Sequence, residues 1–396
     1  MKAFVPLAVV AILLAACGEP PTQPPSVVAG RAPRSTAALT QADGTPVMRF
    51  LANPRHLAWG PEGALYVAEA GRGGTAPCFI VLSSTVCYGP TGAVSRLLPD
   101  GEQERIIDDL PSWVTTRNAN GTINRTGRAQ GPNGISLDSW GNAYVSIGLE
   151  ADPSKRASAP ELAGFGTLVR MSPTLLNEGH ANAHAKRADW EFVADIGQFE
   201  LDVNPDCGDL DSNPFGVLAD GGKILIADAG GNAIVRSTPS GKLSTFAAFT
   251  NNTTVPGEGC PSPGTRDFVP TSIVKGPDGA YYIGHLNGLP IAAGSSTVWK
   301  MEADGAPEVY CTGFTWIIAL AFDDQGNLYV LQHSDGPTTN NNGSLIRVAP
   351  DCSRTTVVTG LFRPTGVAAD ALGNVYVSMI VGTNFAGEGQ VRRFTP

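Results

Sequence analysis

The sequence predicts an all-β chain made of six repeated units, and two periodic features carry that prediction. A hairpin-like stretch, with alternating apolar residues on both sides of a tight turn, begins at His56, Gly134, Gly216, Ser272, Ala319 and Gly366. Its first and last positions are 13 residues apart in five copies and 12 in the third copy. An apolar-x-basic triplet follows each hairpin, with its basic residue at Arg96, Arg170, Arg236, Lys300, Arg347 and Arg393.

The two ends of this repeated region complement each other. If each unit is a four-stranded antiparallel sheet, the last unit lacks its outer strand, because the chain stops at residues 389–396. Residues 46–52 have strand character and precede the first hairpin, so they can supply the missing strand. Such a closure leaves no unpaired sheet edge. We therefore predict a six-bladed β-propeller over residues 45–396, closed by an N-terminal strand that joins the last blade.

The N-terminus predicts export and a lipid anchor. Lys2 precedes an apolar run over residues 4–14, which is too short to span a bilayer. Residues 14–17 (Leu-Ala-Ala-Cys) resemble a bacterial lipobox, which implies a lipoprotein signal peptide over residues 1–16 and diacylation of Cys17. The alternative is an ordinary secretory peptide with a chance cysteine. Because Gly18 is not aspartate, the resemblance favours the outer membrane, facing the periplasm or the cell surface.

Residues 17–44 are rich in Pro, Ser and Thr and show no apolar periodicity, so we predict a disordered tether there. The formal net charge of −9 argues against nucleic acid and against an anionic membrane surface as partners. We expect contact with the membrane through the lipid anchor only. The expected partner is a small molecule or another exported protein, and the chain itself is expected to be a monomer.

Six further cysteines occur in the exported part, at Cys78, Cys87, Cys207, Cys260, Cys311 and Cys352. An even number in an exported protein indicates disulfides, and six cysteines allow 15 pairings. Cys78–Cys87, Cys207–Cys260 and Cys311–Cys352 are the preferred pairs, while the other pairings stay open. No two cysteines have CxxC spacing, so zinc is not expected.

A candidate binding site follows from the register of the repeats. Polar side chains occupy the channel-facing slots of four hairpins, at His56, Glu69, Asp228, His285 and Gln332. Two imidazoles and two carboxylates can bind a divalent cation, hold a polar ligand, or act as base and acid. The bland alternative is a set of solvated channel residues. No cofactor is evident, and a divalent metal is the one that these residues would suit. Asp206, Asp209 and Asp211 form a weaker calcium candidate, for which turn and cap roles are favoured.

Four segments resemble the ScyD/ScyE family of NHL-like proteins, at residues 67–74, 211–236, 269–284 and 313–331. The resemblance implies a TolB-like six-bladed propeller and no established reaction. The chain departs from the family pattern at four positions. His56 stands where Gly is usual, His285 and Gln332 stand where Glu is usual, and Ala319 stands where Asp is usual. An acidic central ring is therefore weaker here.

Two function classes remain. The preferred one is a membrane-tethered, non-catalytic propeller that binds a small ligand or a protein partner. The alternative is a lactonase-like hydrolase or streptogramin-lyase-like enzyme acting at the channel mouth. Residues 131–135 resemble the Asn-Gly element of gluconolactonase-like propellers without the rest of their triad. His285 and Glu69 could mimic the His and Glu of streptogramin-lyase-like propellers, but the surrounding motif is missing.

Overall fold

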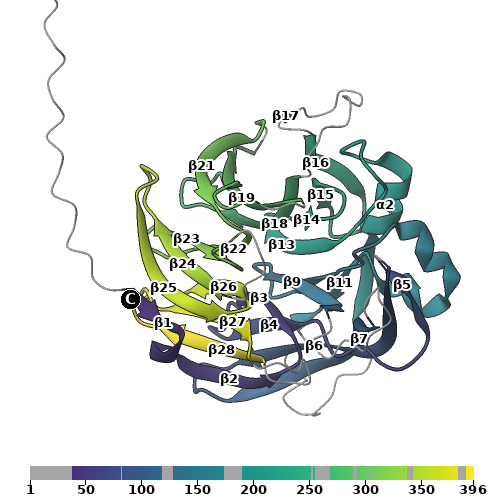
Figure 1. Ribbon diagram of the computed structural model, residues 1–396, viewed down its shortest axis with the longest axis horizontal. Helices are drawn as coiled ribbons and strands as arrows, with labels where there is room; N and C mark the ends of the chain where they lie inside the picture. The colour runs from purple at the N-terminus through teal and green to yellow at the C-terminus, as the bar shows by residue number, and fades with distance from the viewer. Residues whose placement is uncertain are drawn as a thin grey trace, which may run out of the picture. The chain divides into compact units, whose positions relative to one another are not determined.

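The computed structural model describes residues 38–81, 83–117, 128–173, 190–250, 253–254, 268–288, 292–303, 305–336, 342–381 and 389–396. Its strands form six antiparallel sheets arranged around a central axis, which confirms the predicted six-bladed propeller (Figure 1). The innermost strands contact one another around the ring and close it. No helix in the described residues is long and apolar enough to span a bilayer.

Each blade is built from four strands that follow one another outward from the axis. The innermost strands are β3 (Pro54–Trp59), β9 (Pro132–Leu137), β13 (Pro214–Asp220), β18 (Phe268–Lys275), β22 (Ile317–Phe322) and β26 (Pro364–Ala369). The second strands are β4 (Leu65–Glu69), β10 (Ala143–Ile147), β14 (Lys223–Asp228), β19 (Tyr281–Asn287), β23 (Leu328–Gln332) and β27 (Val375–Ile380).

The outer half of each blade consists of its third and fourth strands. The third strands are β6 (Ser84–Leu97), β11 (Thr167–Met171), β15 (Ala233–Ser237), β20 (Ser296–Met301), β24 (Asn342–Val348) and β28 (Gly389–Phe394). The outermost strands are β7 (Gln103–Arg117), β12 (Glu191–Asp195), β16 (Leu243–Thr250), β21 (Glu308–Phe314), β25 (Arg354–Phe362) and β2 (Thr45–Leu51). Additional elements are β1 (Leu39–Thr40), β5 (Cys78–Val81), β8 (Ala129–Gln130), β17 (Thr253–Thr254), η1 (Gln41–Asp43), η2 (Pro153–Ser158), η3 (Pro160–Gly164) and α2 (Ile196–Val203).

The ring closes as the sequence predicts. Strand β2 pairs antiparallel with β28, from Thr45 opposite Arg393 to Leu51 opposite Gly389. Met48 and Leu51 are fully buried and pack between the sixth and first blades. The ordered structure begins upstream of this strand, because β1 and η1 occupy residues 39–43, which the sequence analysis placed in the tether. Strand β1 pairs in parallel with β25 of the fifth blade.

The core consists of six apolar layers, one between each pair of neighbouring blades. Successive side chains of a strand point to opposite faces of its sheet, so one strand supplies two layers. In β14, for example, Leu225 and Ala227 pack against the fourth blade, whereas Ile224 and Ile226 pack against the second. This alternation is the periodicity that the hairpins show in the sequence.

Disulfides link Cys78 with Cys87 and Cys311 with Cys352, as predicted. The first pair joins β5 to β6, and the second joins β21 to the turn before β25. Cys207 is also disulfide-bonded, but its predicted partner, Cys260, lies outside the described residues.

Candidate functional site

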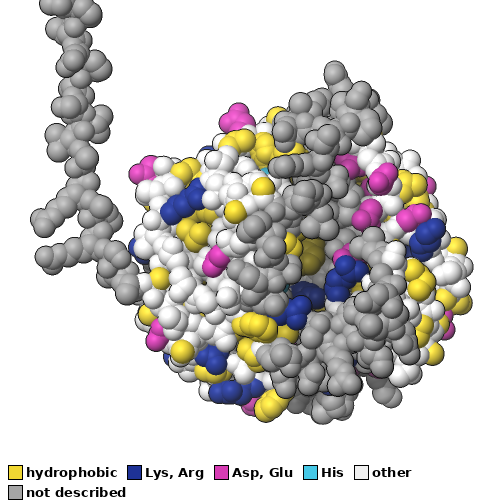
Figure 2. Space-filling view, viewed as in Figure 1, with side chains coloured by type: hydrophobic (Ala, Val, Ile, Leu, Met, Phe, Trp, Pro, Cys, Tyr) yellow, Lys and Arg dark blue, Asp and Glu magenta, His cyan; other side chains and the backbone are white. Residues whose placement is uncertain are grey.

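The second strands end, and the innermost strands begin, on the same face of the ring, because the two strands of each hairpin are antiparallel. We call the opening of the channel on this face the channel mouth. Figure 2 shows Lys and Arg side chains near the middle of the ring. The sequence predicted a mixed site of imidazoles and carboxylates at this mouth, so the position of each predicted residue matters.

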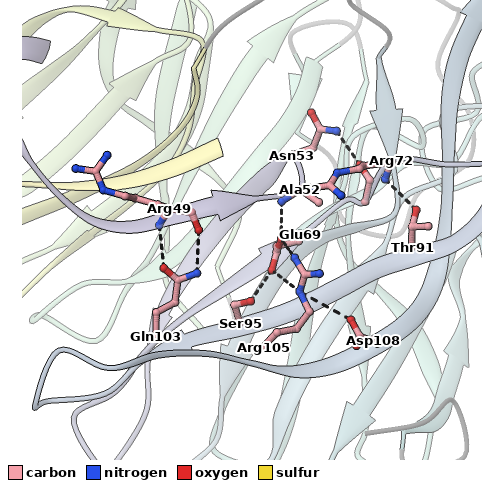
Figure 3. Close-up of polar contacts among 11 residues, drawn as sticks. Arg49, Ala52, Asn53, Glu69, Arg72, Thr91, Ser95, Gln103, Arg105 and Asp108 are labelled. Atoms are coloured by element: carbon pink, nitrogen blue, oxygen red, sulfur yellow. Dashed lines mark hydrogen bonds and ion pairs between the residues drawn. The ribbon is translucent and has the colours of Figure 1, made fainter. Parts of the chain in front are cut away.

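Glu69, the last residue of β4, is completely buried and serves its own blade. Its carboxylate accepts hydrogen bonds from the Ala52 backbone N–H at 2.5 Å and from Ser95 Oγ at 2.5 Å, and Arg105 Nη2 binds it at 2.7 Å (Figure 3). These partners come from the link between β2 and β3, from β6 and from β7. Glu69 therefore ties the closing strand to the first blade and does not face a ligand site.

Asp228 and Gln332 repeat this arrangement in the third and fifth blades. Asp228 Oδ1 accepts the Asn213 backbone N–H at 2.5 Å, and Gln332 Oε1 accepts the Thr315 backbone N–H at 2.7 Å. In each case the side chain at the end of the second strand satisfies a backbone N–H just before the innermost strand. An orphaned buried N–H is costly, which explains why a polar residue recurs at this slot.

His285 lies in β19 of the fourth blade, and its side chain contacts β20. Its Nδ1 accepts the Trp299 indole N–H at 3.0 Å, so the proton resides on Nε2, which donates to Asn287 Oδ1 at 2.6 Å. Burial lowers the pKa of this imidazole. His285 is thus a neutral core histidine whose two ring nitrogens are both occupied.

His56 is the predicted residue that enters the channel. It lies in β3, where the equivalent position in other blades is Gly134 or Gly366. Its Nε2–H donates to the Ile318 carbonyl of the fifth blade at 3.0 Å, and its ring meets that of Phe215 from the third blade edge-on at 5.1 Å. His56 therefore reaches across the axis and fills it, with 8% of its surface exposed.

His56 predicts a pH dependence of stability. Burial is the main cause that lowers the pKa of His56 to about 4, from the 6.5 of an unfolded histidine. Between these values the unfolded chain binds more protons, so the contribution to stability is fully present above pH 6.5 and is lost as the pH falls to 4. Over this pH range, the free energy of unfolding of the wild type should fall by about 3 kcal/mol more than that of His56→Gln, which keeps a donor for Ile318. Urea titrations at several pH values measure both. Equal losses in both proteins would contradict the assignment.

Among the described residues, no hydrogen bond, ion pair or ring contact joins any two of these five side chains. Each is satisfied within its own blade or, for His56, by apolar and backbone groups of other blades. No direct contact therefore joins the five residues, and a shared role in ligand binding stays a prediction.

A different set of side chains meets at the channel mouth. Arg55, the second residue of β3, and Arg363, the residue before β26, come from neighbouring blades; we call them the guanidinium pair. Burial lowers the pKa of both, and the charge of Arg363 further lowers that of Arg55, to about 10. Arg55 Nη2 donates to the Ala129 carbonyl at 2.7 Å, but its Nε is buried without an acceptor in the described residues.

The fifth blade adds two rings to the guanidinium pair. His333 Nδ1–H donates to the Pro364 carbonyl at 2.7 Å, and burial together with the charges of Arg363 and Arg55 lowers its pKa to about 4. Trp316 stacks on His333 with ring centroids 6.0 Å apart. The indole N–H of Trp316 is buried and has no acceptor among the described residues. Two cations and one free indole donor thus face the mouth together.

The opposite side of the mouth is lined by amides. Gln130 and Asn133 bond to each other at 3.0 Å, and a Cβ built on Gly148 would lie 2.6 Å or less from both amides and from Asn213 Oδ1. Glu150 accepts from Gln130 at 2.7 Å and pairs with Arg128 at 2.8 Å. Burial raises the pKa of Glu150, and the charges of Arg128 and Arg55 offset only part of this increase. Glu150 therefore links the amides to the guanidinium pair.

Backbone distortion marks this mouth. A register shift, typical of a β-bulge, occurs near the start of the innermost strand in all six hairpins. Bulges redirect side chains and are common beside functional sites. In addition, Asn53, Trp316 and Arg363 have φ values of 55°, 50° and 48°, a left-handed conformation that costs a non-glycine residue about 1 kcal/mol. All three immediately precede the innermost strand of their blade.

The three residues of the weaker calcium candidate, Asp206, Asp209 and Asp211, have different surroundings in the structure. Asp209 is exposed, and Asp206 caps its own loop by accepting from the Gly208 N–H at 2.8 Å. Asp211 is partly buried, and its Oδ1 has no donor among the described residues. Burial, with the nearby charge of Asp228, raises the pKa of Asp211 to about 7. In the described residues, no group of three His, Cys, Asp or Glu side chains is arranged for a metal ion.

Comparisons with known proteins assign neither a family nor an activity to this chain. No protein-family model and no curated protein sequence matches the chain, so the ScyD/ScyE resemblance stays a prediction. Similar solved structures include a gluconolactonase of Xanthomonas campestris (10% identity, 89% of each chain, TM-score 0.49) and a streptogramin B lyase (11% identity, 89% of this chain and 97% of that one, TM-score 0.42). A virginiamycin B lyase of Staphylococcus aureus is 10% identical over 87% of this chain and 96% of its own, with a TM-score of 0.42. Similarity at this level assigns no activity to this chain.

Proposed function

We propose that this protein binds a small anionic ligand at the channel mouth, through the guanidinium pair. The observation that carries the proposal is a pair of partly buried guanidinium groups, Arg55 and Arg363, whose charges act on each other, with the Arg55 Nε and the Trp316 indole N–H lacking acceptors in the described residues. Burying cations together is costly unless negative groups compensate them. Glu150, the acid whose charge acts on Arg55, also forms an ion pair with Arg128.

The chemistry of the donors narrows the ligand class. Guanidinium groups bind carboxylate, phosphate and sulfate oxygens through paired N–H donors. The stacked Trp316 and His333 offer a flat surface for an unsaturated or ring-shaped part of the ligand. The amides of Gln130, Asn133 and Asn213 would receive its neutral polar groups.

The test is calorimetric titration of the purified protein with phosphate, sulfate, selenate and small dicarboxylates. Arg55→Gln and Arg363→Gln should each weaken binding by about 10- to 100-fold, because a hydrogen bond to a charged group contributes about 1.5–3 kcal/mol. Arg236→Gln, at an exposed arginine of the third blade, is the matched control and should bind as the wild type does. Binding that is unchanged in both mouth variants would refute the proposal.

A hydrolase or lyase reaction at the same mouth is the second candidate, favoured by one feature of His333. Its Nδ1–H is used by Pro364, which leaves Nε2 as a neutral base beside the guanidinium pair. Its pKa of about 4 makes it a weak base, and a bound anion would raise that value. Mass spectrometry of a bound ligand after incubation separates the two functions: conversion lost in His333→Asn, with binding retained, indicates catalysis.

The proposed site would work at the cell envelope, tethered through Cys17. The lipobox-like residues 14–17 support this part of the proposal and lie outside the described residues. In the native host, Cys17→Ser should move the protein from the membrane fraction to the soluble fraction, because the diacyl group has no attachment point. Detergent extraction followed by mass spectrometry of the N-terminal peptide measures the lipid directly. An unchanged membrane fraction for the variant would contradict the anchor.

A further inference from the structure

A second polar site lies in the third blade, apart from the guanidinium pair. Helix α2 ends close to the turn that follows β14, and Glu200 of this helix points into the protein. Glu200 is 2% exposed, and its Oε1 is buried without a donor among the described residues. A buried carboxylate that accepts no hydrogen bond is strongly destabilising, so something must compensate it.

The Glu200 carboxylate shares a small space with a second carboxylate. A Cβ built on Gly231 would lie 2.7 Å from Glu200 Oε2 and 3.3 Å from Asp228 Oδ2. Both oxygens therefore lie on the same side of Gly231, close to where a side chain would begin, and glycine at this position lets them approach the backbone. Asp228 Oδ1 is occupied by three backbone N–H groups, from Asn213, Gly230 and Gly231, whereas Oδ2 accepts from Ser212 Oγ alone among the described residues.

The residue after Gly231, Asn232, supplies a neutral oxygen. Asn232 is 7% exposed, and its amide nitrogen donates to Asp206 Oδ2 at 2.8 Å. The amide oxygen of Asn232 is consequently directed away from Asp206, and it is buried without a donor in the described residues. An oxygen in this state is a ready ligand for a cation.

The charges around Glu200 have one sign. The groups that act on it electrostatically are Asp228, Asp206 and Asp211, and burial with these charges raises the pKa of Glu200 to about 8. No Lys or Arg in the described residues contributes to this balance. In the metal-free protein, protonation of Glu200 below about pH 8 relieves this repulsion, and a bound cation would relieve it in the proton's place.

We propose that the space beside Gly231 is a calcium site, in which Glu200 and Asp228 supply carboxylate oxygens and Asn232 supplies an amide oxygen. The described residues hold no cluster of three acidic, His or Cys ligands, so backbone oxygens and water complete the coordination. Calcium accepts six to eight oxygens in irregular arrangements, whereas magnesium requires near-octahedral geometry and zinc favours His and Cys. The ion would join α2 to the end of β14, and this inference stands independently of the proposed anion site.

The test combines metal stoichiometry with thermal unfolding of the intact protein. After EDTA treatment and gel filtration, the wild type should take up one calcium per chain in calorimetry, and its Tm should rise by roughly 3–5 °C at a hundredfold excess of free calcium over Kd. Glu200→Gln removes a ligand charge with little change of shape. This variant should lose the calcium-dependent shift and melt at a higher temperature than the wild type in EDTA at neutral pH, because the wild-type Glu200 must take up a proton on folding, whereas glutamine is neutral in both states.

Two further variants keep the inference falsifiable. Gly231→Ala places a methyl group in the proposed calcium site and should weaken calcium binding at least tenfold. Asp209→Asn removes an exposed acid from the loop that follows α2 and should bind calcium as the wild type does. Absence of calcium uptake by the folded wild type would overturn the inference. Equal loss in Asp209→Asn and Glu200→Gln would also overturn it, since that result indicates diffuse surface charge.

Discussion

Met48→Asp should prevent stable folding of the ring. Met48 lies in β2, the strand that the N-terminal end of the chain contributes to the sixth blade, and it is fully buried between that blade and the first. The substitution removes a large apolar side chain from this layer and places a charge there without a partner. Each effect costs about 2–5 kcal/mol, and their sum is comparable to the whole stability of a typical domain. Circular dichroism melting and size-exclusion chromatography measure the loss.

Arg49→Asp is the matched control. Arg49 is the next residue of β2 and is exposed; its backbone N–H and C=O, not its side chain, pair with the Gln103 amide. This variant introduces the same charge on the same strand and should change stability by less than about 0.5 kcal/mol. If Met48→Asp melts like Arg49→Asp, β2 does not hold the ring closed, and the closure described above is wrong.

Glu69→Ala should destabilise the protein by about 3–5 kcal/mol and leave the anion affinity of the folded protein unchanged. The substitution leaves the Ala52 N–H and the Arg105 guanidinium without their acceptor, and removal of one partner from a buried ion pair is more costly than loss of the pair itself. Because Arg105 is partly exposed, water recovers a share of this loss. Urea denaturation of the two proteins measures the difference.

The companion variant Glu69→Gln retains an acceptor for Ala52 and should lose about half as much stability. The anion titration distinguishes the structural role from the role that the sequence suggested for Glu69. If a Glu69 variant folds normally but binds the anion tenfold more weakly, Glu69 takes part in ligand binding, and its assignment to a structural role is wrong.

The fold could be read from the sequence because its determinants are periodic. Apolar residues alternate along the second strands, as in β27, and each layer between blades needs that alternation. The closing strand was predictable because the residues that follow the last hairpin supply only a third strand, and residues 46–52 have strand character outside any hairpin. The predicted tether extended too far, to residue 44, since polar residues such as Thr40 and Gln41 show no apolar periodicity. Their role depends on hydrogen bonds to Asp43 and to Phe362, far along the chain.

The site was harder to predict because two neighbouring positions of each hairpin have different roles: the end of the second strand and the start of the innermost strand. The slot of Glu69 and Asp228 at the end of the second strand carries polar side chains, but these satisfy backbone N–H groups inside the blade. The channel mouth is formed instead by Arg55 and Arg363, which flank the first proline of an innermost strand. Only the bulge and the left-handed backbone after the preceding strand turn these positions to the mouth. Alternation alone does not reveal such a turn.

The most direct test of the central claim is anomalous diffraction from crystals soaked in selenate, an oxyanion whose selenium can be located unambiguously. We predict the strongest selenium peak between Arg55 and Arg363, within hydrogen-bond reach of the Trp316 indole nitrogen, and its loss in crystals of the Arg55→Gln variant. Selenium peaks confined to exposed arginines such as Arg236, with none at the channel mouth, would contradict the account.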